Sequence, residues 1–264
     1  MRLCLALFSL AAGAGLFGQT DEGFPDLIPE QRGGVQYMPT VERALELHGY
    51  ALTRESLLRG LRDANAQVRS MAADELAKQG DKEAVPSILE ALSSEKAIGT
   101  RVLMANALAK LGVEAGTVEL RAICEPATAS NHARLVAAGD LLRAGDATCR
   151  DQVVDIVRSI NTLESTTRES LLVYGLTLFT GRFAPLFQPK AAEVREVATT
   201  LLRDRDRGVR MAASNTLSEH GDAASLRELQ AAAEVETDNV TRVRMLANAK
   251  TLEDKGRSAA GRRE

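Results

Sequence analysis

Residues 68–81 read VRSMAADELAKQGD, and residues 209–222 read VRMAASNTLSEHGD. When both stretches are extended back to the preceding Leu-Arg-Asp, nine of 21 aligned positions are identical without a gap. Related stretches start near residues 100, 133, 167 and 241, so a similar unit recurs about every 32 to 34 residues, with one longer interval. A period of this length predicts a repeat architecture in place of a single globular fold.

Each unit has the pattern of two helices. In the second helix of the first copy, Val68, Ala72, Ala73 and Leu76 have the spacing of one buried helical face. Glycines at the matching point of four units have the position of a left-handed helix C-cap: Gly80, Gly112, Gly145 and Gly221. The first helix of each unit is shorter. We therefore expect an all-α fold from residue 40 to residue 254.

The lines from Asp63 to Asp81 and from Asp204 to Asp222 both read D-x-x-x-x-V-R-x-x-A-x-x-x-L-x-x-x-G-D. This pattern resembles the HEAT-repeat family, specifically the short HEAT-like repeats of the phycobilisome-lyase type. The resemblance implies a right-handed α-solenoid of about six HEAT-like antiparallel helix pairs. The resemblance also implies a protein-protein interaction scaffold. Among HEAT-repeat proteins, the chain resembles bacterial exported proteins of unassigned role. A lyase-type enzyme or enzyme subunit is the alternative that the same resemblance leaves open.

The composition excludes some classes of function. The 264 residues carry a formal net charge of −3 and contain no Trp. A nucleic-acid-binding protein needs a surplus of Lys and Arg to neutralise phosphates, so we do not expect nucleic acid as a partner. Aromatic residues make up only 3% of the chain, which does not favour an aromatic-lined ligand pocket. The expected partner is a protein or a peptide, and the oligomeric state is left open.

The first 18 residues, MRLCLALFSLAAGAGLFG, have one early Arg, an apolar run and several small residues at the end. This layout predicts a secretory signal peptide, with an uncleaved anchor as the alternative, and a periplasmic or secreted protein. After cleavage we expect no membrane span. Residues 19–39 read as a linker that precedes a helix at 40–48, and residues 255–264 read as a disordered tail.

Export would leave Cys124 and Cys149 in an oxidising compartment, where a disulfide could form. The repeat register places Cys124 near the end of one helix and Cys149 near the start of the next parallel helix. An offset of about eight helical positions is roughly 12 Å, which is beyond the reach of a disulfide. We therefore expect two small buried side chains without a bridge, although whether they stay free is left open.

The sequence presents no recognisable catalytic constellation. His48, His132 and His220 lie in different repeats, and none has a second His or Cys at the spacing of a metal site. Neither a nucleophile elbow nor a glycine-rich phosphate loop is present. We expect no catalytic residues, no metal and no cofactor, and a protein that is not an enzyme.

Arginine recurs at one position of each repeat: Arg69, Arg101, Arg134, Arg168, Arg210 and Arg242. A row of arginines could bind an acidic partner. Alternatively, each arginine reaches an Asp or a backbone carbonyl at the neighbouring helix turn and stabilises the stack. Asp63 and Asp204 precede the second helices, and we expect them to cap these helices and to meet the arginine.

Equivalent outward positions of successive repeats should form a ridge on the curved face of the stack. Lys78, Lys110 and Arg143 occupy one such position, with Asp74 and Asn106 one turn away. These five residues are candidate partner-binding residues, and the alternative is a solvated face.

Residues 179–190, FTGRFAPLFQPK, interrupt the repeat with three phenylalanines in a chain that is poor in aromatic residues. Phe179, Phe183 and Phe187 are therefore additional candidates for contact with a partner. The alternative is a loop that folds its own phenylalanines onto the solenoid.

Overall fold

The structure is a computed structural model, and it describes residues 30–32, 35–37, 40–125, 129–162 and 167–260. It divides into two compact units, Met1–Cys149 and Arg150–Glu264, which are described separately here. The predicted signal peptide at 1–18 lies outside the described residues, as do much of the predicted linker and the last four residues of the predicted tail.

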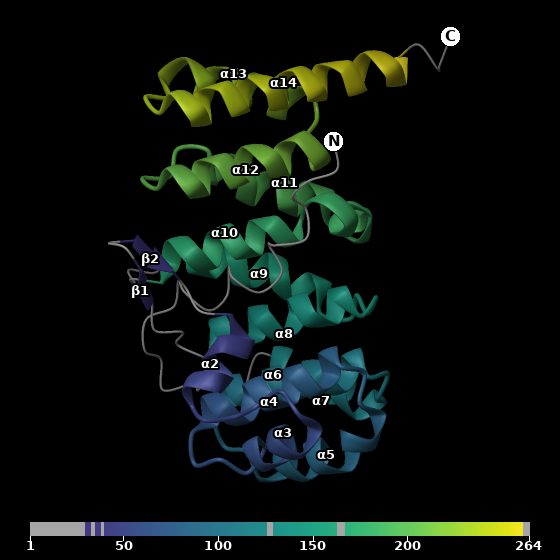
Figure 1. Cartoon of the computed structure of the whole chain (residues 1–264). Coiled ribbons are helices and arrows are strands. Elements are labelled where there is room, and N and C mark those ends of the chain that lie inside the picture. The colour runs from purple at the N-terminus through teal and green to yellow at the C-terminus, as the bar shows by residue number, and fades with distance from the viewer. Residues whose placement is uncertain (1–29, 33–34, 38–39, 126–128, 163–166, 261–264) are drawn as a thin grey trace. The chain divides into compact units, whose positions relative to one another are not determined.

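The first unit contains three helix pairs, preceded by a short hairpin and one further helix. Its elements are β1 (Glu30–Arg32), β2 (Val35–Tyr37), α2 (Val41–Leu47), α3 (Arg54–Gly60), α4 (Ala66–Lys78), the 3-10 helix η1 (Lys82–Ala84), α5 (Val85–Ser94), α6 (Ile98–Lys110), α7 (Glu114–Cys124) and α8 (Asn131–Arg143). The pairs are α3–α4, α5–α6 and α7–α8 (Figure 1).

The second unit contains three more helix pairs, α9–α10, α11–α12 and α13–α14. Its elements are α9 (Arg150–Ile160), α10 (Arg168–Leu178), the 3-10 helix η2 (Gly181–Lys190), α11 (Ala191–Leu201), α12 (Arg207–His220), α13 (Ala223–Val235) and α14 (Asn239–Ala260). The predicted all-α fold of about six helix pairs is confirmed. The ten residues of η2 explain why 42 residues separate Arg168 from Arg210, where the other intervals are 32 to 34.

The second helices of successive pairs pack against each other within each unit. In the first unit α4 contacts α6 and α6 contacts α8, and in the second unit α12 lies between α10 and α14 (Figure 1). The repeated alanines lie at these contacts and are buried: Ala72, Ala73, Ala105, Ala137, Ala138, Ala212 and Ala213. Small side chains suit these contacts because close-packed helices leave little room for a larger side chain.

The predicted glycine C-caps are confirmed at three of the four positions. Gly80, Gly112 and Gly145 have positive φ, as the C-cap prediction requires. Gly221 does not, because its φ is −68°. Its lack of a side chain serves a different purpose, since a Cβ at this position would collide with the Leu217 carbonyl oxygen and the Leu252 side chain.

The predicted caps at Asp63 and Asp204 are wrong by two residues. The N-caps of α4 and α12 are Asn65 and Asp206, whose side chains accept hydrogen bonds from the first turn of each helix. The Asp63 and Asp204 carboxylates instead accept from the backbone N–H groups of those cap residues, at 2.6 Å and 2.9 Å. They order the turn that leads into the helix.

Two predictions about the ends of the chain need correction. The predicted linker contains an antiparallel pair of short strands in which Glu30 pairs with Tyr37. The last helix runs to Ala260, past the predicted end of the solenoid at residue 254. Lys255 holds this extension against α12 by donating to the Ser218 carbonyl at 2.7 Å.

The expectation of two unbridged cysteines is also wrong, because Cys124 and Cys149 form a disulfide with a Cα–Cα distance of 6.4 Å. The helical-rise argument failed because Cys149 precedes α9 and is not part of a helix. The non-helical residues 144–149 run beside α7, as the 2.7 Å contact between Arg121 Nε and Asp146 Oδ2 shows. Both contacts join residues that are 25 positions apart in the sequence.

Within the described ranges, no single helix has the length and apolar content of a membrane span. The pair formed by residues 168–178 and 181–201 meets those criteria only together, and it is bent by 85°.

Candidate functional site

The repeated arginines form ion pairs that connect consecutive helix pairs. Arg69 donates through one guanidinium nitrogen to the Asp63 carbonyl at 2.7 Å, and a second nitrogen lies 2.6 Å from a Glu95 carboxylate oxygen. Arg210 repeats this arrangement with the Asp204 carbonyl at 2.9 Å and Glu236 at 2.6 Å. We call these two sets of contacts the arginine clamps.

The carboxylates of the clamps are buried and fully engaged. Glu95 also accepts from the backbone N–H groups of Lys96 and Ala97, each at 2.8 Å, next to the start of α6. The neighbouring Arg210 guanidinium holds the pKa of Glu236 below its ordinary value. The structural role predicted for Arg69 and Arg210 is therefore confirmed. Glu95 and Glu236 were not predicted as their partners, although each glutamate lies 26 residues after its arginine.

The other repeat arginines are also engaged in contacts with neighbouring turns. Arg168 pairs with Asp204 at 2.6 Å, and Arg134 donates to the Cys124 carbonyl at 3.2 Å. Arg101 pairs with Glu119 on α7, and Arg242 donates to Asn239. The row of arginines thus contributes to the stack, and it does not form an unpaired basic surface.

The predicted partner-binding row lies on α4, α6 and α8 of the first unit and is connected by carboxylates. The Asp74 carboxylate forms two ion pairs. It lies 2.7 Å from Lys110 Nζ of the next repeat and 3.2 Å from Lys78 Nζ of its own helix. Arg143 pairs with Asp140 at 2.5 Å on α8. Together these five residues form what we call the polar ladder.

Asp140 is the most unusual member of the polar ladder. One of its carboxylate oxygens has no hydrogen-bond partner among the described residues. Burial raises its pKa to about 6, and the positive charges of Arg143 and Lys110 oppose this rise. Near neutral pH the folded protein therefore keeps a poorly solvated carboxylate inside α8.

Two of the predicted partner-binding residues differ from expectation. Asp74 was predicted to point outward, but it is buried because it bridges α4 and α6. Asn106 is half-buried. Lys78, Lys110 and Arg143 keep part of their side chains exposed while their charges are balanced by neighbouring carboxylates. Contact between this row and a partner stays a prediction.

A groove that lies between α5 and α7 was not predicted from the sequence. Its volume is about 660 Å³, and the residues that line it are Leu89, Leu92, Ser93, Glu95, Arg101, Glu114, Ala115, Val118 and Glu119. Val118 is 52% exposed and belongs to this lining. The α5–α7 groove therefore has an apolar floor that is open to solvent.

The rim of the α5–α7 groove is net acidic. Glu119 is paired with Arg101, and Glu95 is held by Arg69. Glu114 has no ion-pair partner within the part of the chain that the structure describes, and it lies in the first turn of α7. The groove therefore presents one unpaired carboxylate beside apolar side chains.

The phenylalanine-rich segment is packed into the second unit. Phe179 and Phe187 are fully buried, with ring centroids 4.8 Å apart in an edge-to-face arrangement. Their predicted contact with a partner is therefore incorrect for this fold, because Phe179 at the end of α10 and Phe187 in η2 both lie in the core. Phe183 is half-buried and lies under the Arg182 guanidinium.

His220 completes the same region. Its Nε2 atom lies 2.6 Å from the Phe179 carbonyl oxygen, and burial lowers the pKa of its imidazole below the ordinary value. His220 is therefore a structural side chain between α10 and α12. Across the described ranges, no group of His, Cys, Asp and Glu has the arrangement of a metal site.

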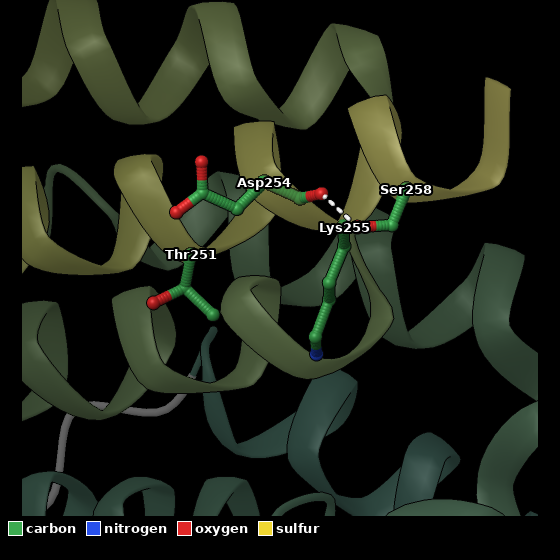
Figure 2. Close-up of a pocket in the computed structure, with 4 residues that line it drawn as sticks. All are labelled: Thr251, Asp254, Lys255 and Ser258. Carbon is green, nitrogen blue, oxygen red and sulfur yellow. Dashed lines mark hydrogen bonds between the residues drawn. The ribbon is translucent and has the colours of Figure 1, made fainter. Parts of the chain in front are cut away.

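A shallow hollow of about 390 Å³ lies on α14 beside Thr251, Asp254, Lys255 and Ser258. Figure 2 shows Ser258 bonded to the Asp254 carbonyl, while the Lys255 ammonium and the Asp254 carboxylate point away from each other. The hollow is wide open, and its Lys255 and Ser258 side chains both donate to backbone carbonyls.

A family model described as HEAT repeats matches residues 54–138, which extend from α3 into α8. No curated protein matches the chain. The matched region contains the first arginine clamp and the α5–α7 groove, and the second unit repeats the same helix pairs and the same clamp. Residues 54–138 are therefore similar to HEAT repeats, and the rest of the described chain is built from helix pairs of the same kind.

Proposed function

We propose that the chain is a non-catalytic scaffold that binds a segment of a partner protein in the α5–α7 groove. HEAT repeats are commonly protein-interaction scaffolds, which supports this class of function. The observation that carries the proposal is the groove itself, in which exposed Val118 lies beside the unpaired Glu114. An apolar floor with a few placed polar groups is the usual chemistry of a recognition site.

The groove indicates the chemistry of the bound segment. Leu89, Leu92 and Val118 would receive one or two apolar side chains, whose burial provides most of the binding free energy. Glu114 would pair with a Lys or Arg that follows on the segment. The polar ladder is a second candidate surface, because its three cations keep part of their side chains exposed along neighbouring helices.

We further propose that the protein works outside the cytoplasm, after removal of residues 1–18. The Cys124–Cys149 disulfide supports this location, because such bonds persist in oxidising compartments. The mass of the protein purified from its natural host tests the proposal. The expected mass lacks the first 18 residues, and an intact N-terminus on soluble cytosolic protein would contradict it.

Site-specific photo-cross-linking tests the groove. A photoreactive residue replaces Val118 in the groove, Lys110 in the ladder, or Leu47 on α2, which has a similar exposure of 57% and serves as the control. We expect an adduct from position 118 that maps to an apolar segment with a neighbouring cation, and none from position 47.

A charge reversal then checks the recognition chemistry. Glu114→Lys should weaken binding of the mapped segment as a synthetic peptide, while the equally exposed change Glu83→Lys on η1 should not. Adducts from position 110 alone would assign binding to the polar ladder. Adducts from neither position, or an unchanged affinity after Glu114→Lys, would contradict the groove proposal.

A further inference from the structure

Each of the two helices that border the α5–α7 groove presents one regular face to it. On α5, Leu89, Leu92 and Ser93 line the groove, and intervals of three and four residues place them on the same side of the helix. On α7, Ala115 and Val118 line the groove and are three residues apart. Three residues of helical rise amount to about 4.5 Å, so both helices present apolar side chains at this axial interval.

This interval matches the side-chain spacing of a helix better than that of a strand. Residues three or four positions apart on a helix are separated by about 4.5–6 Å along its axis. Residues on the same side of a strand are separated by about 6.5–7 Å. A helix bound in the groove can therefore place successive apolar side chains between the turns of α5 and α7, in the way that helices pack within proteins.

Most polar side chains of the groove are already bonded within the chain. Glu95 belongs to the first arginine clamp, and Arg101 is paired with Glu119. The Ser93 hydroxyl donates to a backbone carbonyl of its own helix at 2.7 Å. The backbone groups inside α5 and α7 are bonded within each helix. A segment that enters the groove must therefore satisfy its own backbone N–H and C=O groups, because unpaired polar groups are costly to bury.

The common modes of peptide recognition differ in how they satisfy the backbone. A bound strand needs the edge of a sheet, and none of the described residues that line the groove belongs to a strand. A polyproline segment needs an aromatic-lined groove, and none of these lining residues is aromatic. A bound helix forms its backbone hydrogen bonds internally and needs only an apolar groove. The groove is therefore suited to a helix.

The charge of the groove favours a helix that carries a cation. Three glutamates and one arginine line the groove, so an acidic helix would be repelled. Among these four residues, Glu114 alone has no ion pair with another residue that the structure describes. Glu114 precedes Val118 by four residues, which is about one helical turn. A Lys or Arg that lies one turn from the apolar residue in contact with Val118 would pair with this carboxylate.

We propose that the α5–α7 groove binds an amphipathic helix of a partner protein. The apolar residues of this helix recur at three- and four-residue spacing, and a Lys or Arg lies one turn from them. This inference rests on the proposed function of the groove, and it adds the conformation and the residue pattern of the bound segment. The spacing of the apolar residues on α5 and α7 and the unpaired Glu114 carry it.

Selection from a phage-displayed library of random peptides, each of about 16 residues or four helical turns, tests the pattern. The full chain is the target, and sequences that also bind Val118→Arg are removed, so that only binders that need the groove remain. We expect these sequences to share apolar residues three and four positions apart, a Lys or Arg, and no internal Pro, because Pro breaks a helix. Alternating apolar residues or Pro-rich sequences would overturn the proposed helix. A library without any Val118-dependent binder would contradict the proposed function of the groove as well.

The tightest of these peptides, made synthetically, tests the bound conformation and the ion pair. Its helical circular dichroism should increase on binding, and a Pro at its centre should weaken binding roughly a hundredfold. Glu114→Lys should weaken binding roughly fivefold, and exchange of the peptide cation for Glu should restore it, whereas the control Glu83→Lys should change neither affinity. Equal melting temperatures of the variants exclude damage to the fold. Binding without a gain of helix, or binding that tolerates the central Pro, would overturn the proposal.

Discussion

The two units use the same arginine clamp but join their second helices by different chemistry. In the first unit, α4 and α6 are linked by the ionic contact of Lys110 with the buried Asp74. In the second unit, α12 and α14 are linked by hydrogen bonds from the neutral Asn248. The clamp lies within the repeated motif, whereas the contact between second helices depends on side chains that vary from repeat to repeat.

This difference has a consequence for pH dependence. The polar ladder contains Asp140, a carboxyl group whose pKa burial raises to about 6. The contact between α10 and α12 contains His220, an imidazole that burial keeps neutral. Acidification should therefore act on the two units in opposite directions. The following predictions test the shared clamp first and then the differences between the units.

Loss of a clamp should have the largest effect, and the effect should be similar in both units. Arg69→Met or Arg210→Met leaves a buried carboxylate without its cation, so the free energy of unfolding should fall by about 3–5 kcal/mol. Chemical denaturation with hydrogen exchange assigned to each unit measures this loss. The control is Arg62→Met, whose exposed pair with Glu90 should contribute only about 0–1 kcal/mol. Equal effects at positions 62 and 69 would show that Glu95 does not need its arginine.

Reduction of the disulfide should weaken the first unit alone. The bridge closes a loop between residues that are 25 positions apart, and such a loop contributes about 3 kcal/mol. Hydrogen exchange with and without a reductant should show faster opening of α7 and α8 and unchanged α11 to α13. The double variant Cys124→Ala/Cys149→Ala should not respond to the reductant. A uniform response of both units would contradict the assignment of the bridge to the first unit.

Asp140→Asn should remove a pH-dependent loss of stability from the first unit. The pKa of Asp140 is raised from 3.8 to about 6, so the protonated carboxyl contributes stability that is complete below pH 3.8 and is lost as the pH rises through 6. Relative to wild type, the Asn variant should therefore gain roughly 2–3 kcal/mol between pH 4 and pH 7. Denaturation curves at several pH values measure the gain, and a difference that does not change with pH would contradict a buried carboxyl at position 140.

His220 should produce the smaller and opposite dependence in the second unit. Its pKa lies below the ordinary value of 6.5, so the unfolded chain takes up a proton more readily than the folded chain. Stability is then present above pH 6.5 and is lost as the pH falls through the folded pKa. His220→Gln should flatten this acid loss in hydrogen exchange of α12. An acid response that persists in the variant would assign it to other groups.

Much of the fold could be predicted because the repeat is a local pattern. The spacing of Val68, Ala72 and Leu76 predicts a helix with one buried face, and the recurrence of Arg69 and Arg210 predicts a common contact. Their recurrence favoured a structural role, but the alternative of a row that binds an acidic partner could be set aside only from the contacts of each arginine. Their actual acceptors, Glu95 and Glu236, follow only from the packing of the next helix pair.

The candidate surfaces were harder to predict. The outward direction assigned to Asp74 followed from helical periodicity, but a neighbouring helix brings Lys110 to this carboxylate and buries it. The α5–α7 groove arises from two helices that belong to different repeats, so no single stretch of sequence contains it. Phe187 was ambiguous because the 3-10 helix that turns it into the core is stabilised by contacts with α10, α11 and α12.

The sequence by itself determined the all-α class, the six helix pairs and the recurrence of the clamp arginine, because each depends on spacing along one helix or on the length of one repeat. Only the tertiary structure decided the Cys124–Cys149 bridge, the burial of Asp74 and Asp140, and the groove between α5 and α7. These features depend on which side chains of separate helices and turns come within a few ångströms of each other. Periodicity determines which side of a helix a residue occupies, whereas packing determines what covers that side.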